Sequence, residues 1–365
     1  MFMITRLPQQ FINRNFWGVT FLPIIIYSLV LGCRYGWGVD YPWYKVRIEN
    51  PFFYQSEDIG FRLINLTLKD LGFNYVGVYI FYSFMFILCA YVLIKNYKDN
   101  KYMLALFLPA TLIFSTWCIR QGFAHSLAFL SIYFIDKRQW VWLLITCFVT
   151  ATIHPSTIIT IAIIFGVYLL NRKTPISFLY TIPIYVIITL CSEFFNTQIT
   201  QGINNFIAAI SMTGESRLET VYLSRGDTWF GDDAVKDNLK QGYLALLLSM
   251  TFHISTMYLG YIALKYQNVR SIINLYHISI IGMILYRLFF YFEILKRVAN
   301  PLEMLYFIPL GYGLSVVLKN KKILTKHEVT LSYVCIMSVV VYLTLYWGRF
   351  ILMSPKCRFV WNIVH

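Results

Sequence analysis

The sequence predicts an all-α, polytopic membrane protein with about 10–11 transmembrane helices, and three features of its composition support this. Hydrophobic residues make up 58% of the 365-residue chain, against roughly 45–50% in a soluble domain. Charged residues make up 13%, about half the usual share, which is too few to cover a soluble protein of this size. Aromatic residues reach 18%, and such rings are favoured at membrane interfaces.

Eleven apolar runs are candidate spans, each near the roughly 20 residues that cross a bilayer. Two longer runs, 103–135 and 140–171, would each form a helix of about 50 Å, whereas a bilayer core is about 30 Å thick. We divide the first at 120–121 and the second at 154–156, where a proline disfavours helix. The short halves fit full spans or re-entrant, kinked helices. The runs are 16–33, 75–94, 103–119, 121–135, 140–154, 156–171, 176–195, 242–264, 274–292, 301–318 and 329–347.

The distribution of charge predicts a cytoplasmic N-terminus. The loops that would then face the cytoplasm hold 15 Lys and Arg residues and three acids, Asp99, Asp136 and Glu328. The opposite side holds 16 basic and 14 acidic residues in longer segments. Short basic loops inside follow the positive-inside rule. Eleven spans would place the tail, residues 348–365, on the outer side, whereas one additional re-entrant segment would place it inside.

Two outer segments, 34–74 and 196–241, are long enough to be functional, because loops beyond about 12–15 residues are usually functional or disordered. We expect the whole chain, residues 1–365, to be a single transmembrane domain that carries both. Arginine is enriched on the outer side, and its planar fork suits phosphate, so an anionic, phosphate-bearing ligand is expected there. The outer arginines are Arg34, Arg47, Arg62, Arg120, Arg217, Arg225, Arg287, Arg297, Arg349 and Arg358.

Several classes of site are disfavoured. The net charge of +14 is scattered over short loops, as in a membrane protein that fixes its orientation, so no nucleic-acid partner is expected. The seven Cys residues have no CxxC spacing, which argues against a disulfide framework or a zinc site. No metal or cofactor is predicted. Asp232 and Asp233 are the nearest competitor for a metal pair.

Four short motifs carry the candidate site residues. The first follows the first span and contains Arg34, Tyr35, Asp40, Tyr41 and Tyr44. Charged groups beside tyrosine rings can form a surface for sugar and phosphate, because sugars bind aromatic faces and carboxylates accept their hydroxyls. The alternative is a structural pair between Arg34 and Asp40 that staples the segment to the interface.

The other motifs lie at predicted helix ends or breaks. Arg120 and Gln121 lie at a break, where an arginine is a functional candidate by default; the alternative is that Arg120 snorkels to the interface. His154 lies at the second break, where it can act as a base near neutral pH or simply bond to a free carbonyl. Arg287 and Tyr291 end a later run, and a charge at that depth normally faces a cavity or a partner.

In this order the motifs resemble those of the EpsG family of exopolysaccharide proteins. The shared patterns are R-Y-x-x-G-x-D-Y-x-x-Y from Arg34 to Tyr44, R-Q-x-x-A from Arg120, a His-x-Ser at His154, and R-x-x-x-Y-F from Arg287. The family's acidic residue ahead of a Gly-Phe pair is matched by Glu57, with looser spacing. The resemblance covers about residues 30–300.

The resemblance implies a polysaccharide polymerase of the Wzy type in a bacterial inner membrane. Such proteins join glycan repeat units carried on undecaprenyl diphosphate, at the periplasmic face. Applied to this chain, Arg120 and Arg287 would hold the leaving diphosphate with help from Arg34, and His154 or Asp40 would be the base. Further substrate contacts are expected from Tyr35, Tyr41, Tyr44, Gln121 and Tyr291. The expected partners are the lipid-linked oligosaccharide, the bilayer and a chain-length regulator.

Three other functions remain open. A lipid-linked-oligosaccharide flippase or transporter would distribute charged residues through the membrane depth and carry repeated halves. A membrane O-acyltransferase acting on polysaccharide would take its acyl donor from the cytoplasmic side, so its catalytic His should face inward. A glycosyltransferase with a single-sugar lipid phosphate donor would carry acids in its first outer segment, where Asp40 lies.

Overall fold

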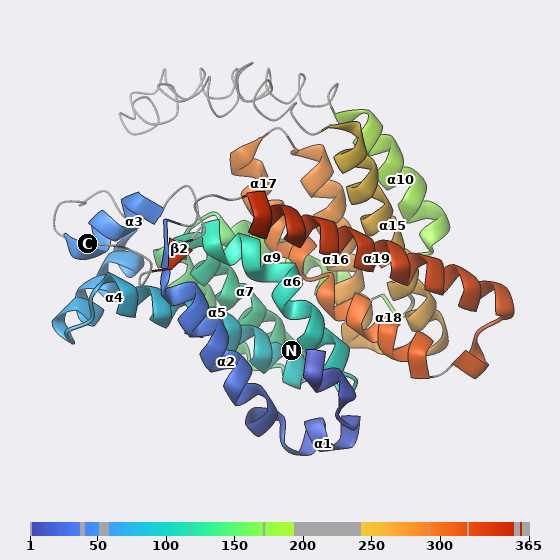
Figure 1. The fold of residues 1–365 in the computed structure, drawn as a ribbon, viewed down its shortest axis with the longest axis horizontal. Coiled ribbons are helices and arrows are strands. Elements are labelled where there is room, and N and C mark those ends of the chain that lie inside the picture. The colour runs from blue at the N-terminus through green and yellow to red at the C-terminus, as the bar shows by residue number, and fades with distance from the viewer. Residues whose placement is uncertain are drawn as a thin grey trace. The chain divides into compact units, whose positions relative to one another are not determined.

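The protein is seen in a computed structural model that describes residues 2–36, 41–50, 58–117, 119–170, 172–192, 242–290, 292–319, 321–353 and 358–359. These residues are almost entirely helical, as predicted (Figure 1). Two short strands, β1 (Arg34–Tyr35) and β2 (Arg358–Phe359), are the exception among them. The helices are η1 (Phe2–Arg6), α1 (Gln9–Arg14), α2 (Phe16–Gly32), α3 (Tyr41–Glu49), α4 (Ile59–Asp70), α5 (Tyr75–Lys95), α6 (Lys101–Trp117), α7 (Ile119–Asp136), α8 (Trp140–Ile153), α9 (Thr157–Leu170), α10 (Phe178–Leu190), α15 (Tyr243–Tyr266), α16 (Arg270–Leu288), α17 (Glu293–Met304), α18 (Phe307–Lys319), η3 (Lys321–Ile323) and α19 (Lys326–Met353).

The helices have the length and polarity of membrane spans. Within the described residues, five segments are long and apolar enough to cross a bilayer: Tyr75–Lys95, Tyr243–Tyr266, Arg270–Leu288, Leu295–Lys319 and Lys326–Gly348. Shorter apolar helices are α2, α8, α9 and α10. Large apolar side chains on α2, α8 and α19 are exposed, among them Phe21, Leu144, Phe148, Val334 and Met337. Apolar surface of this extent needs a lipid or protein cover, so the chain is a multi-pass membrane protein.

The second predicted helix break, at 154–156, is present. α8 ends at Ile153, and His154 follows in an extended conformation, with φ −155° and ψ 94°. The first predicted break, at 120–121, stays a prediction: α6 is described to Trp117 and α7 from Ile119, and Arg120 is the second residue of α7. α8 and α9 have 14 residues each and are therefore about 21 Å long, shorter than a bilayer core. A hairpin of this kind begins and ends on one side, so the predicted orientation does not depend on whether its tip crosses.

The chain divides into two compact units. The first unit comprises Met1–Asn171, Phe307–Leu324 and Leu343–His365, and the second comprises Arg172–Tyr306 and Thr325–Tyr342. That both belong to one domain stays a prediction.

In the first unit, the segment after the first span packs its aromatic rings onto the helices. Tyr44 of α3 contacts Phe61 of α4 with 5.9 Å between ring centroids, and Phe61 stacks on Tyr82 of α5 at 5.4 Å. Gly60 allows α4 to approach α8 closely, because a β-carbon there would overlap Thr152. The Gly-Phe pair of the sequence motif therefore has a packing role.

A short antiparallel pairing joins the start of this segment to the C-terminal tail. Arg34 pairs with Phe359 and Tyr35 with Arg358. Strands that share hydrogen bonds lie on the same side of the membrane, so the tail and the first outer segment are together. This agrees with the odd number of spans in the sequence-based topology.

Each of the three acids predicted to face the cytoplasm links helices within its own unit. Asp136 ends α7 and accepts hydrogen bonds of 3.0–3.2 Å from three side chains, those of Asn96, Tyr97 and Tyr168. Asp99 accepts a hydrogen bond of 2.8 Å from Nζ of Lys319, on α18.

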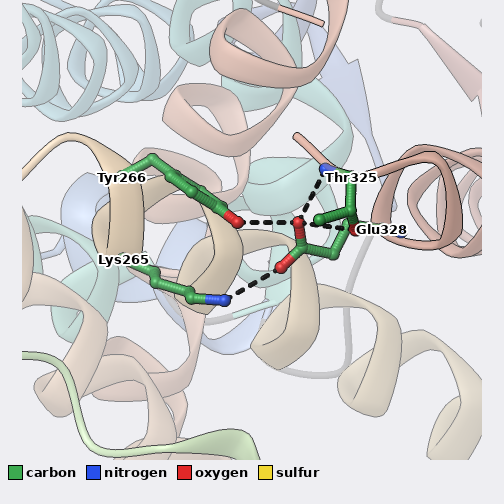
Figure 2. Close-up of polar contacts among 4 residues, drawn as sticks. All are labelled: Lys265, Tyr266, Thr325 and Glu328. Carbon is green, nitrogen blue, oxygen red and sulfur yellow. Dashed lines mark hydrogen bonds and ion pairs between the residues drawn. The ribbon is translucent and has the colours of Figure 1, made fainter. Parts of the chain in front are cut away.

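The third acid, Glu328, joins α15 to the start of α19 (Figure 2). Its carboxylate accepts hydrogen bonds from Nζ of Lys265 at 3.0 Å and from the hydroxyl of Tyr266 at 2.8 Å. It also accepts from the backbone N–H of Thr325 at 2.9 Å, while Oγ1 of Thr325 accepts from the N–H of Glu328 at 3.2 Å. This reciprocal arrangement is a capping box, and it fixes where α19 begins.

The second unit brings α10, α15, α16 and α17 together. α16 and α17 touch backbone to backbone at Gly282, where a β-carbon would overlap Leu302 and Glu303. This close contact sets the position of the Glu303 side chain, which points into the polar site described next.

Candidate active site

Arg287 is buried in the second unit, with 2% of its surface exposed. It lies near the end of α16, as the sequence predicts. Its Nε donates a hydrogen bond to the hydroxyl of Tyr185 at 3.1 Å, and its Nη2 donates to Oγ of Ser249. These two hydroxyls fix the plane of the guanidinium.

A chain of hydrogen bonds continues from Arg287 across the unit. The hydroxyl of Tyr185 lies 2.7 Å from Nδ1 of His253, and Nε2 of His253 lies 2.8 Å from Oε1 of Glu303. Tyr185 and His253 are buried, and 18% of the Glu303 side chain is exposed. The four residues come from α16, α10, α15 and α17.

The direction of each hydrogen bond follows from the groups involved. An ionised carboxylate can only accept, so Nε2 of a neutral His253 carries the proton and donates to Glu303. Nδ1 then has a lone pair that accepts from the Tyr185 hydroxyl. The oxygen of Tyr185 accepts from Arg287, which can only donate. The chain therefore runs from a cation to an anion with every donor pointing toward Glu303.

The first motif forms an aromatic cluster in the first unit. Arg34 is buried, donates from Nη1 to the carbonyl of Leu31 at 2.6 Å, and lies 5.2 Å from the ring centroid of Tyr79. Tyr41 packs edge-on against both Tyr35 and Tyr79, at 5.7 and 5.2 Å. Burial lowers the pKa of the Arg34 guanidinium, and the nearby hydroxyls of Tyr79 and Tyr41 partly offset this lowering. Burial raises the pKa of the Tyr41 hydroxyl.

Arg34 also borders a cavity about the size of one water molecule, whose wall includes Gly122 and Phe123 of α7. The structure thus brings Arg34, Tyr35 and Tyr41 together. Tyr44 belongs to the same buried cluster of side chains.

Arg120 forms an ion pair that the sequence analysis did not predict. Its Nη1 lies 3.1 Å from Oδ2 of Asp58, and the two side chains are 22% and 24% exposed. Asp58 directly precedes α4. Gln121, the next residue of the motif, is buried. The charge of Arg120 is thus partly offset at rest.

His154 lies at the tip of the α8–α9 hairpin. Its Nδ1 is hydrogen-bonded to Oγ of Ser156 at 2.8 Å. The motif's histidine and serine therefore form a local pair. His125, which is fully buried on α7, is close enough for an electrostatic interaction with His154.

Some predicted residues cannot be located. Asp40, Tyr291 and Glu57 lie outside the described residues, as do Asp232 and Asp233. The sequence motifs did not single out Tyr185, Ser249, His253 or Glu303 as site residues. Ionisable residues inside spans are rare and functional by default, and that criterion, applied to every span, would have selected His253 and Glu303 together with Arg287.

The comparison with known families agrees with the order of the motifs. The sequence model described as EpsG family matches residues 19–355. No curated protein matches the chain, and no solved structure does. The match runs from the first span to the end of α19 and covers nearly the whole chain, which therefore belongs to the EpsG family, a family of Wzy-type polymerases.

Proposed function

We propose that this protein polymerises polysaccharide repeat units carried on undecaprenyl diphosphate, at the periplasmic face of a bacterial inner membrane, with its N-terminus in the cytoplasm. The reaction joins the reducing end of a growing chain to a hydroxyl of a new lipid-linked unit, and the diphosphate leaves. The product belongs to an O-antigen, a capsule or an exopolysaccharide.

The observation that supports this most strongly is the setting of Arg287. A glycosyl transfer of this kind develops negative charge on the departing diphosphate, and an arginine fork is well suited to it. Tyr185 and Ser249 hold the guanidinium through neutral hydroxyls. A group positioned in advance stabilises a developing charge without reorganising during the reaction.

The position of Arg287 along the helices also fits an outer-face site. In the predicted topology, the C-terminal end of α16 faces the periplasm. The same side holds the end of α10 and the start of α15, next to the outer segment 196–241. A lipid-linked substrate in the periplasmic leaflet would reach Arg287 from this side.

The first unit holds further candidates for substrate binding. The aromatic cluster at Tyr35, Tyr41 and Tyr44 offers ring faces for sugars, and Arg34 and Arg120 remain candidates for phosphate. Arg120 would bind a phosphate either by leaving Asp58 or with the ion pair intact. His154 and Asp40 remain candidates for the base.

Glycan profiling in a deletion strain tests the proposal. The strain is complemented with wild type, Arg287→Ala or a control, Arg270→Ala, which changes an exposed arginine at the other end of α16. We expect single repeat units on lipid in the null and Arg287→Ala cells, long polymer with the control, and equal amounts of each protein in the membrane. Normal polymer length in the null strain would refute the proposal. A change in acetylation alone would favour an acyltransferase, and units trapped in the cytoplasmic leaflet would favour a flippase.

A further inference from the structure

In the second unit, the residues hydrogen-bonded in series with Arg287 can do more than hold its guanidinium in place. We propose that Tyr185, His253 and Glu303 form a proton relay that takes up the proton of the acceptor hydroxyl. This inference rests on the proposed polymerase function and names a base different from His154 and Asp40.

The geometry supports a relay because its three members are hydrogen-bonded in series with matched polarity. Glu303 fixes the Nε2–H tautomer of His253, and Nδ1 of His253 faces the Tyr185 hydroxyl at 2.7 Å. A carboxylate that orients an imidazole, which in turn accepts a proton from a hydroxyl, is the arrangement that activates nucleophilic hydroxyls in hydrolases. Here Tyr185 takes the place of that hydroxyl, and its oxygen receives the proton of the acceptor.

Arg287 connects the relay to the leaving group. Its Nε donates to the oxygen of Tyr185, the same atom whose proton faces His253. A cation at this oxygen stabilises negative charge that develops on it as its proton moves away. One guanidinium can therefore neutralise the diphosphate and support the proton transfer.

The transfer forms one bond to carbon and breaks another. The acceptor oxygen forms a bond to the anomeric carbon while the bond from that carbon to the diphosphate oxygen breaks with its electron pair. The acceptor proton passes to the oxygen of Tyr185, and the proton of Tyr185 passes to Nδ1 of His253. The products are the glycosidic bond, free undecaprenyl diphosphate and an imidazolium ion beside Glu303, which later returns its proton to water.

Three helices present charged or titratable groups to His253: Tyr185 on α10, Arg287 on α16 and Glu303 on α17. Tyr342 on α19 interacts electrostatically with Arg287 and Glu303. Of these, Glu303 stabilises the imidazolium ion and Arg287 opposes it. A fixed structural network would also hold these helices together, so the test needs a readout beyond loss of activity.

The readout is the pH dependence of polymerisation in membranes that contain the strain's own lipid-linked repeat units. The rate per amount of protein is measured between about pH 5 and pH 8, where histidine titrates, for wild type, Tyr185→Phe, His253→Gln and Glu303→Gln. The control is His277→Gln, another buried histidine of this unit, whose Nε2 accepts from the backbone N–H of Ile176 at 3.0 Å.

We expect the wild-type rate to rise with pH as neutral His253 forms, and the control to match it. Tyr185→Phe should lower the rate by at least about 100-fold, the usual scale of acid–base catalysis. His253→Gln should abolish the rise with pH. Glu303→Gln should move the rise to lower pH, because a lost carboxylate charge no longer favours the imidazolium ion.

A pH profile unchanged in shape in all three variants would overturn the relay, even if the rates fell. If His253→Gln or Glu303→Gln fails to accumulate in the membrane, Tyr185→Phe still tests the relay, because it keeps the ring and removes only one oxygen. If wild-type membranes make no polymer from lipid-linked units, the polymerase function fails; if they do and the variants behave as wild type, the relay alone fails.

Discussion

The carboxylate of Glu303 and Nε2 of His253 are 2.8 Å apart, and this contact depends on a glycine in a third helix. Gly282 of α16 lies against the backbone at Glu303, where a β-carbon would not fit. The reach of the Glu303 side chain to α15 is therefore set by how closely α17 packs on α16. The two residues are joined by packing as well as by charge.

Gly282→Ala should weaken the candidate site without removing any of its polar groups. The added methyl forces the backbone of α17 away, so the Glu303–His253 hydrogen bond lengthens. We expect slower polymerisation and a destabilisation of about 1–3 kcal/mol, the usual cost of overpacking, measured by thermal unfolding in detergent. Gly166→Ala is the control, because nothing lies within 4 Å of its β-carbon position. That variant should be neutral or up to about 1 kcal/mol more stable, since alanine favours helix.

Arg287→Lys should not restore function. Lysine keeps the positive charge but lacks the planar fork that contacts Tyr185 and Ser249 together. We expect a loss of about 100-fold or more in polymerisation rate, similar to the loss of one preorganised donor in other enzymes. Full activity of Arg287→Lys would mean that a point charge is sufficient and that the fork geometry is irrelevant.

The Arg120–Asp58 pair can be tested by exchange. Arg120→Asp or Asp58→Arg alone places like charges together and should lower the amount of protein in the membrane. The double exchange should restore the amount, because a partly exposed ion pair contributes up to about 1 kcal/mol in either order. If Arg120 also binds phosphate, polymer length will remain short in the double exchange. Recovery of both amount and polymer would assign Arg120 a structural role alone.

The pairing of β1 with β2 predicts the location of the C-terminus. A C-terminal alkaline phosphatase fusion should be active, and a C-terminal green fluorescent protein fusion should be dark, because the tail shares a side with Arg34. A fluorescent fusion truncated after Lys322 should be bright, since that loop is predicted to be cytoplasmic. Fluorescence of the full-length C-terminal fusion would show that the strand pairing or the number of spans is wrong.

Thr325→Ala should destabilise the protein and leave its product unchanged. The substitution removes the side chain that caps α19 and accepts from the N–H of Glu328. Loss of such a cap costs about 0.5–2 kcal/mol, which thermal unfolding can detect. The distribution of polymer lengths should equal that of wild type, because this contact lies on the predicted cytoplasmic side. Shorter polymer at equal protein amount would show that the α15–α19 contact affects catalysis.

Much of the fold follows from the sequence because span length and charge placement are local properties. Every predicted run coincides with a helix or a helix pair, and the break at Pro155 lies where the ring of proline disfavours helix. The break predicted at 120–121 has no comparable local signal and stays a prediction. The capping box of α19 could also have been found, because Thr325 and Glu328 have the spacing of that motif.

The candidate site was only partly predictable. Arg287 stood out as a charge inside an apolar run, and Arg120 as a charge at a helix break. The partners of these residues lie far away in sequence: Asp58 for Arg120, and Tyr185 and His253 for Arg287. Contacts of this kind depend on how helices pack, which hydrophobic periodicity does not encode. The family motif directed attention to Glu57, whereas the neighbouring Asp58 forms the ion pair.

The most direct test of the central claim is reconstitution. Purified protein in liposomes is supplied with undecaprenyl-diphosphate-linked repeat units, and the products are separated by size while released undecaprenyl diphosphate is quantified. The account predicts chains of two or more units, one diphosphate released for each bond formed, and loss of both in Arg287→Ala. Movement of units across the bilayer without new glycosidic bonds would contradict it.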